Sequence, residues 1–384
     1  MAFAAQYTAR PTLIALSHLR WDFVFQRPQH LLTRAAADYD VLVVEEPIWT
    51  DDAAPGVNLL DREHGIRVVQ PTLPHGTSHA AAIDHQKLVL DGLVAGTEGP
   101  LTLWYYTPMA MAFSRHIEPD VTIFDKMDEL SAFADPPPLL QALEAELLER
   151  ADVVFTGGAA MHAAAVNRHD NIHCFPSSID TAHFGEARDG LPDPADQAAI
   201  ARPRIGFFGV IDERMDVALV GEIAALRPDW QIVMIGPTAK IDPADLPGAA
   251  NLHWLGGKSY ADLPPYLANW DVGFMPFAIN DATKFISPTK TPEFLAAGLP
   301  VVSTAIADVV EPYGNLGLVE IASTAADTVA AIERVMARPR GAWLAEVDAQ
   351  LAQCSWDQVW ADMHALMLAV SEPAAPHLKE TTRV

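Results

Sequence analysis

Basic residues are scarce in this chain of 384 residues. Lysine and arginine number 25 against 50 aspartates and glutamates, which gives a formal net charge of −25 at pH 7. A surface this acidic repels nucleic acid and anionic lipid headgroups at long range, which argues against a nucleic-acid partner. Only seven residues are lysine, and two of them, Lys284 and Lys290, lie close together. A local basic pocket for a phosphorylated ligand stays compatible with this composition.

Cysteines and long apolar runs are also scarce. Cys174 and Cys354 have no metal-type spacing, and two cysteines indicate no disulfide framework, so a reducing, cytoplasmic location is expected. Residues 1–10 lack the basic region and apolar core of a secretory signal. No apolar run approaches the roughly 20 residues that span a bilayer, so membrane contact would be peripheral.

Short β-branched runs alternate with helical stretches in both halves of the chain, which predicts βαβ units and an α/β fold with mainly parallel sheets. Expected strands are 12–16, 41–45, 66–69, 101–105, 121–124, 152–156, 172–175, 204–209, 231–235, 252–255, 271–275 and 318–321. Expected helices are 28–37, 139–150, 217–225, 263–268, 324–336, 343–354 and 356–370. The polar, proline-bearing residues 186–202 interrupt this pattern and are predicted to link a first domain, 1–185, to a second, 203–355.

Residues 287–304 combine a phosphate-binding and a diol-binding group at the start of one short helix. Thr291 is the expected N-cap, Pro292 suits the first helical position, and Glu293 complements the helix dipole. A helix N-terminus with Lys290 beside it suits a phosphate, and a carboxylate suits a sugar diol. The alternative is purely structural: Glu293 would serve the dipole alone, and Lys290 would solvate a loop.

The run from Pro288 to Val302 resembles the donor-binding signature of the retaining "group one" nucleotide-sugar glycosyltransferases, Pro-x-Lys-x-x-Glu-hydrophobic-x-Ala-x-Gly-x-Pro-Val-Val. The resemblance implies the GT-B fold, in which two Rossmann-like domains face a central cleft. It also implies a terminal helix, here 356–370, that crosses back to the first domain. Residues 371–384 are expected to form a flexible tail.

That resemblance implies a metal-independent hexosyl-type transferase that needs no cofactor. The donor would be a UDP- or GDP-linked sugar, and the acceptor a carbohydrate or a lipid-linked sugar of polysaccharide or cell-envelope synthesis. Lys290 would stabilise the departing diphosphate, Glu293 would hold the ribose, and Thr289 and Thr291 would line the donor site. A peripheral position at the inner membrane face follows from a lipid-linked acceptor.

Glycines at strand ends complete the predicted donor side. Gly209 and Gly236 would let the backbone approach a pyrophosphate. The sequence departs from the family here, because Val210 follows Gly209 where the family commonly has arginine. Arg214 either takes over that charge or lies at an exposed helix start. A second departure is Phe285, which stands where the first acid of the family's glutamate pair is expected. The resemblance therefore supports the ribose contact of Glu293 and not the sugar contact.

The loop after the first strand is the predicted acceptor and phosphate loop. It lacks the glycines common in relatives and instead holds charged and aromatic side chains. These are His18, Arg20, Trp21, Gln26 and Arg27. Loops at the carboxyl ends of parallel strands carry function, and arginine contacts phosphate through two hydrogen bonds. The alternatives are a polar helix start for Arg27 and a structural role for His18.

Two carboxylates follow the strand 121–124. Asp125 and Asp128 occupy the region that serves the reaction centre in relatives, so either is a candidate partner or general base for the acceptor hydroxyl. Alternatively, Asp128 caps the next turn. The Asp-x-Asp at 38–40 precedes a strand at its amino end, the wrong edge for a metal-assisted nucleotide-sugar site, and no metal site is expected.

Three other functions fit parts of the pattern. A sugar-nucleotide epimerase shares the fold, and a non-catalytic nucleotide-sugar-binding protein would fit the missing first acid. A dinucleotide-dependent enzyme ranks low, because Gly206 and Gly209 form no full Gly-x-Gly-x-x-Gly motif.

Overall fold

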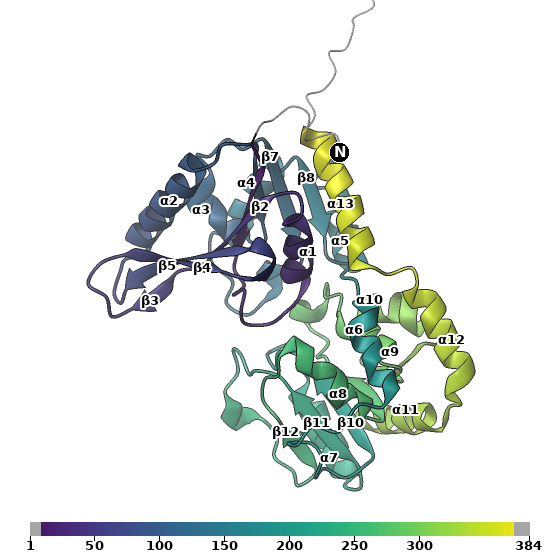
Figure 1. Cartoon of the computed structure of the whole chain (residues 1–384). Coiled ribbons are helices and arrows are strands. Elements are labelled where there is room, and N and C mark those ends of the chain that lie inside the picture. Colours follow the sequence, from purple (N-terminus) through teal and green to yellow (C-terminus); the bar gives the residue numbers. More distant parts are fainter. Residues whose placement is uncertain (1–8, 372–384) are drawn as a thin grey trace, which may run out of the picture.

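The computed structural model describes residues 9–371, which form two lobes, each built on one sheet (Figure 1). The first sheet has nine strands in the order β3-β5-β2-β1-β6-β7-β8-β9, with β4 paired antiparallel to β5. Its strands are β1 Thr12–Ser17, β2 Asp40–Glu45, β3 Ile48–Thr50, β4 Gly56–Asp61, β5 Arg67–Pro74, β6 Leu101–Tyr105, β7 Val121–Lys126, β8 Val153–Thr156 and β9 Ile172–Cys174.

The second sheet is fully parallel and has the order β12-β11-β10-β13-β14-β15. Its strands are β10 Arg204–Phe208, β11 Gln231–Ile235, β12 Leu252–Trp254, β13 Val272–Met275, β14 Val301–Ser303 and β15 Val319–Ile321. The chain reverses its direction of winding between β10 and β13, as it does between β1 and β6 in the first sheet. Ligands bind outside the carboxyl ends of strands at such switch points. The fold is the α/β, GT-B arrangement of two Rossmann-like domains.

Helices cover both faces of each sheet, which explains the continuous apolar runs in the central strands. In β1, Leu13 and Ala15 enter the core on one face, while Ile14 and Leu16 enter the core on the other. Helices of the first lobe are α1 Arg27–Ala35, α2 His79–Ala95, α3 Met111–Ser114, α4 Leu140–Arg150 and α5 Ala159–Ala165. The remaining helices are α6 Thr181–Gly185, α7 Val217–Leu226, α8 Leu263–Ala268, α9 Lys290–Ala296, α10 Ala307–Val309, α11 Ala325–Ala337, α12 Arg340–Leu351 and α13 Trp356–Ser371.

The last described helix, α13, returns to the first lobe (Figure 1). It contacts α1, β7 and β8, and Trp356, Trp360 and Met363 join the apolar core of that lobe. The Trp356 ring stacks on His30 of α1 with centroids 4.5 Å apart. Two chain crossings therefore join the lobes, one before β10 and one before α13. Residues 372–384, most of the predicted tail, lie outside the described residues.

The segment between α6 and β10 packs on the second lobe. Gln197 is fully buried, and its side-chain oxygen accepts a hydrogen bond from the indole of Trp270 at 2.7 Å. Arg204, at the start of β10, donates to the Gln197 carbonyl at 3.1 Å. These contacts fix the polar segment to one side of the cleft.

Three features differ from the sequence-based expectation. The edge strands β3 and β4 and the helix α2 were not predicted, because β4 is mostly exposed and α2 buries only Ala82 and Leu90. The prediction that Thr291 caps α9 is wrong. The helix begins at Lys290 with Thr289 as its N-cap, which puts Pro292 at the third helical position. Proline is tolerated there because the first amides of a helix have no intrahelical acceptor.

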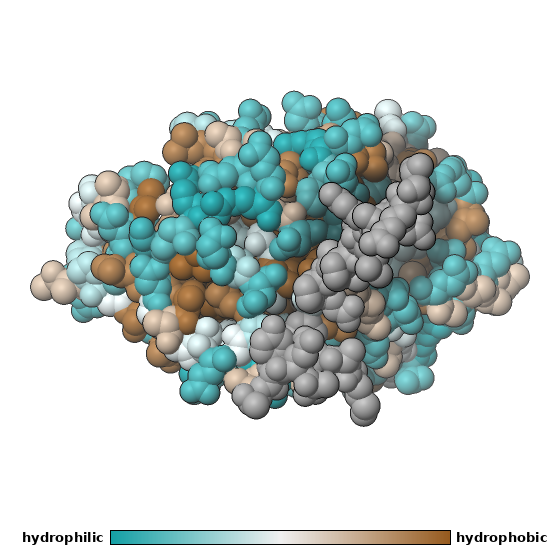
Figure 2. All heavy atoms as spheres, turned by 90° about the horizontal axis from the view of Figure 1, so that it is seen from above, coloured by the Kyte–Doolittle hydropathy of each residue, from teal (hydrophilic) through white to brown (hydrophobic). Residues whose placement is uncertain are grey.

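Hydrophilic residues cover most of the surface seen from the first-lobe end, with hydrophobic residues in patches among them (Figure 2). Exposed apolar side chains of this lobe include Trp49, Leu59 and Leu88. Across residues 9–371, no helix has the length and apolar character needed to cross a bilayer.

Candidate functional site

A cavity of about 750 Å³ lies between the lobes. The first lobe contributes the loop after β1 and residues 62–64, and the second lobe contributes the ends of β10 and β11, the loop after β12, and α9. A smaller cavity of about 140 Å³ adjoins it, since Val24, Gly209 and Lys290 line both. Ligand sites in proteins commonly have such volumes, and the larger cavity lies where the topology predicts a site.

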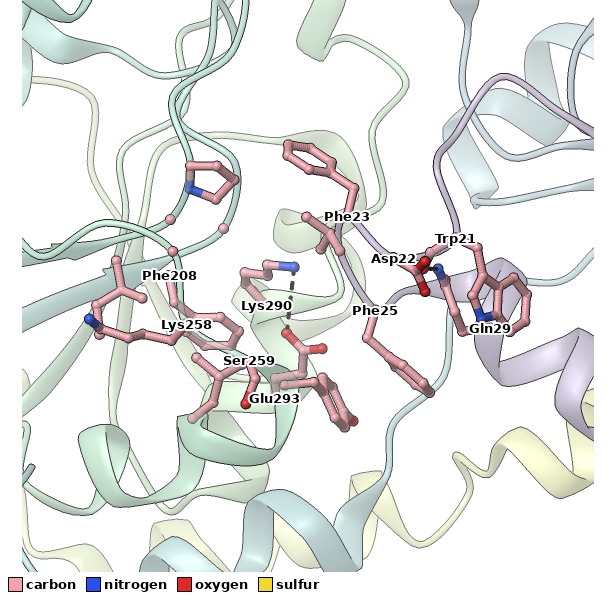
Figure 3. A pocket seen from close by; sticks show the side chains of 18 of the residues that line it. Trp21, Asp22, Phe23, Phe25, Gln29, Phe208, Lys258, Ser259, Lys290 and Glu293 are labelled. Carbon is pink, nitrogen blue, oxygen red and sulfur yellow. Dashed lines mark hydrogen bonds and ion pairs between the residues drawn. The ribbon is translucent and has the colours of Figure 1, made fainter. Parts of the chain in front are cut away.

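Lys290 and Glu293 lie one helical turn apart at the start of α9 and face the larger cavity (Figure 3). Lys290 Nζ lies 3.8 Å from Glu293 Oε2 and donates a hydrogen bond to Thr289 Oγ1 at 3.0 Å. Glu293 is only 7% exposed, and its Oε2 atom is buried without a hydrogen-bond partner. Burial raises the pKa of Glu293, and the Lys290 charge opposes that shift. A buried carboxylate oxygen without a donor is costly, so its place in a cavity points to a ligand that supplies the donor.

Gly209 and Gly236 form the floor between β10 and β11. Both have positive φ angles, 143° and 151°. A Cβ atom at Gly236 would lie 1.7 Å from the Gly209 carbonyl oxygen, and one at Gly209 would lie 3.1 Å from Lys290 Cε. Glycine at these two positions therefore keeps the strand ends close together and leaves room for a ligand beside Lys290.

Arg214 lines the smaller cavity, but its charge is already paired. Its guanidinium donates three hydrogen bonds to the buried carboxylate of Asp212, at 2.7 to 3.1 Å. It also lies over the Phe133 ring of the first lobe, 5.6 Å from the centroid. Arg214 thus sits at the predicted cleft, held by Asp212.

The structure places Arg27 and Asp125 together in a buried ion pair. Arg27 is 1% exposed and Asp125 is fully buried, with guanidinium–carboxylate distances of 2.9 to 3.1 Å. Arg27 also donates to the Phe175 carbonyl at 2.7 Å. Burial raises the pKa of Asp125, and Arg27 opposes the rise. Because each side chain satisfies the other, the pair favours a structural role over the phosphate contact predicted for Arg27 and the base predicted for Asp125.

Asp128, by contrast, lies in the smaller cavity with Gln26 and Lys290. It is only half-buried and lies near His18, whose pKa is lowered by burial while the Asp128 carboxylate opposes the shift. His18 Nδ1 is buried without a hydrogen-bond partner. Asp128 is therefore the first-lobe carboxylate that lines the smaller cavity together with Lys290.

Arg20 and Trp21 are anchored by Glu45, which is 2% exposed. Arg20 donates to that carboxylate at 3.2 Å and to the Pro47 carbonyl at 3.0 Å, and the Trp21 amide donates at 2.6 Å. The Trp21 side chain lines the larger cavity. Arg20 therefore holds the loop in place, while Trp21 is available to a ligand.

The two threonines beside Lys290 differ. Thr289 lines the smaller cavity and orients the lysine through its hydroxyl. Thr291 is 1% exposed, and its hydroxyl lies 3.5 Å from Met275 Sδ. Thr291, the threonine within α9, therefore points into the core and not into the donor site predicted for it.

Sequence reasoning missed an aromatic wall formed by Phe25 and Tyr260. The Tyr260 ring stacks on His183 at 4.3 Å and lies 4.7 Å from the ring of Phe25, which comes from the other lobe. The Tyr260 hydroxyl is buried without a partner, and burial raises its pKa, as does the nearby Glu293 charge. Gly256 and Gly257 just before it, after a short strand, were the available signal.

Lys258 lies in the same loop, but its charge is already paired outside the cavity. It donates to the Leu255 carbonyl at 2.9 Å and pairs with Asp196 at 2.8 Å. The loop after β12 is thereby braced against residues 186–202. Within residues 9–371, no three His, Cys, Asp or Glu side chains gather as a metal-binding group.

Comparisons with known proteins agree with this geometry. Residues 202–338 match the model of the family described as glycosyl transferases group 1. A putative teichuronic acid biosynthesis glycosyltransferase, TuaH of Bacillus subtilis (strain 168), is 26% identical over 220 residues. That match covers 53% of this chain and 55% of the relative, so the chain spans about half the length of the curated relative that it matches.

Solved structures resemble nearly the whole chain. Sucrose-phosphate synthase from Thermosynechococcus elongatus has a TM-score of 0.70 at 15% identity, covering 94% of this chain and 99% of that one. A structure described as trehalose-6-phosphate from E. coli bound with UDP-2-fluoro glucose has a TM-score of 0.67 at 12% identity, covering 94% and 99%. A UDP-forming trehalose-phosphate synthase from Burkholderia vietnamiensis has a TM-score of 0.66 at 15% identity, with the same coverage.

Proposed function

We propose that this chain, a GT-B protein whose second lobe is a group 1 glycosyltransferase domain, moves a sugar from a nucleoside diphosphate to an acceptor. The observation that carries the proposal is the pair at the start of α9. Glu293 presents a buried oxygen without a donor, and Lys290 presents an ammonium group at the same cavity. One group suits a ribose diol and the other a phosphate, at the spacing of adjacent parts of a nucleotide.

Each part of such a donor has a place in the cavity. The nucleoside would lie against the ends of β10 and β11 and the loop carrying Tyr260, with its ribose at Glu293 (Figure 3). The diphosphate would lie by Lys290, above Gly209, where the absence of a side chain leaves space. The structural neighbour described as bound with UDP-2-fluoro glucose supports a nucleotide sugar as the ligand class.

Lys290 would stabilise the leaving group. During transfer, the acceptor hydroxyl oxygen bonds to the anomeric carbon and gives up its proton to the Asp128 carboxylate, while the bond from that carbon to the diphosphate oxygen breaks. Negative charge grows on the diphosphate, and a fixed cation in a secluded site lowers the energy of that charge. Arg214 contributes less to this step because Asp212 already neutralises it. The proposal requires no metal and no cofactor.

Asp128 would serve the acceptor. It faces Lys290 across the smaller cavity, so a hydroxyl held there could donate its hydrogen bond to the carboxylate. Trp21 and Phe25, from the same lobe, would bound the acceptor entrance. Retention of anomeric configuration is part of the proposal through the family resemblance.

The acceptor class and the cellular location are inferred from a relative of this chain and from its net charge. The name of the B. subtilis relative, a putative teichuronic acid biosynthesis glycosyltransferase, supports a carbohydrate or lipid-linked acceptor in cell-wall polysaccharide synthesis. A cytoplasmic protein that reaches a lipid-linked acceptor would touch the membrane peripherally. With a net charge of −25, such contact would depend on a local patch of the first lobe.

The test is a thermal-shift screen of nucleoside diphosphates and their sugars, because a ligand that binds the native state raises the melting midpoint. The expected result is stabilisation by one nucleoside diphosphate and its sugar, followed by acceptor-dependent release of the diphosphate. A product formed without any acceptor would indicate an epimerase. Binding without turnover would indicate a non-catalytic homologue.

A further inference from the structure

Helix α5 of the first lobe is capped by a carboxylate from the second lobe. Its N-cap residue is Gly158, which has no side chain to accept from the first amides. Asp308 in α10 does so instead: Ala159 N donates to its Oδ2 and Ala160 N to its Oδ1, both at 2.9 Å. The first amides of a helix need outside acceptors, and here they obtain them across the cleft.

Glycine is required for this contact. A Cβ atom at Gly158 would lie 2.3 Å from Asp308 Oδ2 and 2.7 Å from Ser287 Cβ, both in the second lobe. One at Gly157 would lie 2.9 Å from the carbonyl oxygen of Met127. Gly157 and Gly158 thus lie between Met127 of the first lobe and Ser287, which precedes α9 in the second lobe.

The other contacts across this side of the cleft are weaker. The Phe133 ring lies between the cations of Arg214 and Lys240, which are 5.6 and 4.6 Å from its centroid. The Ala134 amide donates to Glu213 at a long 3.3 Å. Of these contacts, that of Asp308 combines a carboxylate with two hydrogen bonds of 2.9 Å and a helix dipole of favourable sign.

We propose that Asp308 is a positioning residue that holds the two lobes closed, so that Lys290 on the donor side faces Asp128 on the acceptor side. The inference rests on the proposed function for its catalytic consequence, but the closure itself does not depend on it. Opening the lobes would take these acceptors from two helix amides and both amide partners from the carboxylate at once. The contact therefore biases the pair of lobes toward the arrangement in which the small cavity is formed.

The catalytic test uses Asp308→Ala and Gly158→Ala, the second of which wedges the lobes apart without changing charge. Losing an N-cap of this kind corresponds to about a fivefold fall in the ratio of closed to open lobes. We expect kcat to fall by up to about that factor, while the affinity for nucleoside diphosphate, set mainly by the second lobe, stays within about twofold. Asp308→Asn keeps one acceptor oxygen and should recover part of kcat.

The matched control is Asp242→Ala. Asp242 also caps a helical turn, accepting from Ala244 N at 2.8 Å, but cap and turn both lie in the second lobe. This variant should keep the wild-type kcat. If it lost as much activity as Asp308→Ala, or if Asp308→Ala kept the wild-type kcat, the positioning role would be refuted.

Closure is measured independently of activity by the distance between spin labels. Leu88→Cys and Leu226→Cys place labels on exposed positions of α2 and α7, one in each lobe, after Cys174 and Cys354 are replaced by serine. Asp308→Ala should enlarge the longer-distance population relative to the wild type. Unchanged distances in both Asp308→Ala and Gly158→Ala would refute the proposal that Asp308 holds the lobes closed, even if the transferase proposal holds. If the distance shifts but the protein binds no nucleotide, the role of Asp308 in closure is supported and the transferase proposal is refuted.

Discussion

Removing the Glu293 carboxylate should weaken nucleotide binding without unfolding the protein. Glu293→Ala deletes the buried oxygen that has no partner in the free protein, so the variant leaves no new unpaired donor behind. The fold should survive, because the ion pair of Glu293 with the Lys290 ammonium spans a long 3.8 Å and its Oε2 atom accepts no hydrogen bond from the rest of residues 9–371. Binding, in contrast, should lose a hydrogen bond between a charged acceptor and a ribose hydroxyl.

The magnitude follows from that bond. Hydrogen bonds to charged groups contribute about 1.5–3 kcal/mol net, and each 1.4 kcal/mol is a factor of ten. We therefore expect the dissociation constant for the nucleoside diphosphate to rise by about 10- to 150-fold, measured by isothermal titration calorimetry. Glu222→Ala, the same change at an exposed position of α7, should leave the constant unchanged.

A deoxy ligand sharpens the test. The wild type should bind the 2′-deoxynucleoside diphosphate more weakly than the ribonucleotide, and Glu293→Ala should bind the two almost equally. If Glu293→Ala kept full affinity, or still discriminated the ribose hydroxyl as the wild type does, the diol assignment would be refuted.

Four further expectations concern stability and turnover. Burial raises the folded-state pKa of Glu293 above its ordinary value of 4.5, so the free wild type loses stability as pH rises from 4.5 through the raised value. The melting temperature of Glu293→Gln relative to wild type should therefore increase across that window, and a constant difference would contradict the burial argument. Lys290→Ala should lower transfer by about 10²- to 10³-fold with circular dichroism unchanged, and near-normal turnover would defeat the leaving-group role. Arg27→Ala leaves the Asp125 charge buried alone, so urea titration should show a loss of about 3–5 kcal/mol in unfolding free energy; lost nucleotide binding at full stability would instead indicate a phosphate contact. Asp128→Asn should lower kcat while nucleotide affinity stays within about twofold, and an unchanged kcat would exclude it from the acceptor site.

Local sequence chemistry, together with the family resemblance, pointed to Lys290 and Glu293, which the structure places at the cavity between the lobes. Residues 287–304 combine a helix start, a lysine, a glutamate and a strand, and all four are set by neighbours in sequence. The alternation of strands and helices also predicted two parallel sheets and hence a cleft at their carboxyl ends. Lys290 and Glu293 were identified on this basis. The helix start was misplaced because proline is tolerated at several positions of the first turn.

Long-range pairing was beyond the sequence. From the sequence, Arg27 and Asp125 were both candidates for contacting a ligand. Only the fold shows that these residues, 98 positions apart, form a hydrogen bond of 3.0 Å with each other. The sequence also left open whether Arg214 is free or paired. Asp212, two residues earlier, could either pair with it or point elsewhere, and the structure shows the ion pair. Tyr260 and Phe25 escaped notice because aromatic residues near strand ends are more often core residues. Asp308 became visible only through a contact with the opposite lobe.

The central claim is that the cavity between the lobes binds a nucleoside diphosphate through Lys290 and Glu293. Calorimetric titration of the wild type, Lys290→Ala and Glu293→Ala with the nucleoside diphosphate found by the screen, its monophosphate and its nucleoside tests it most directly. The account predicts that affinity falls from diphosphate to monophosphate to nucleoside, that Lys290→Ala removes the advantage of the diphosphate, and that Glu293→Ala weakens all three ligands. Equal binding of these ligands by the three proteins, or no binding of any nucleoside diphosphate by the wild type, would contradict it.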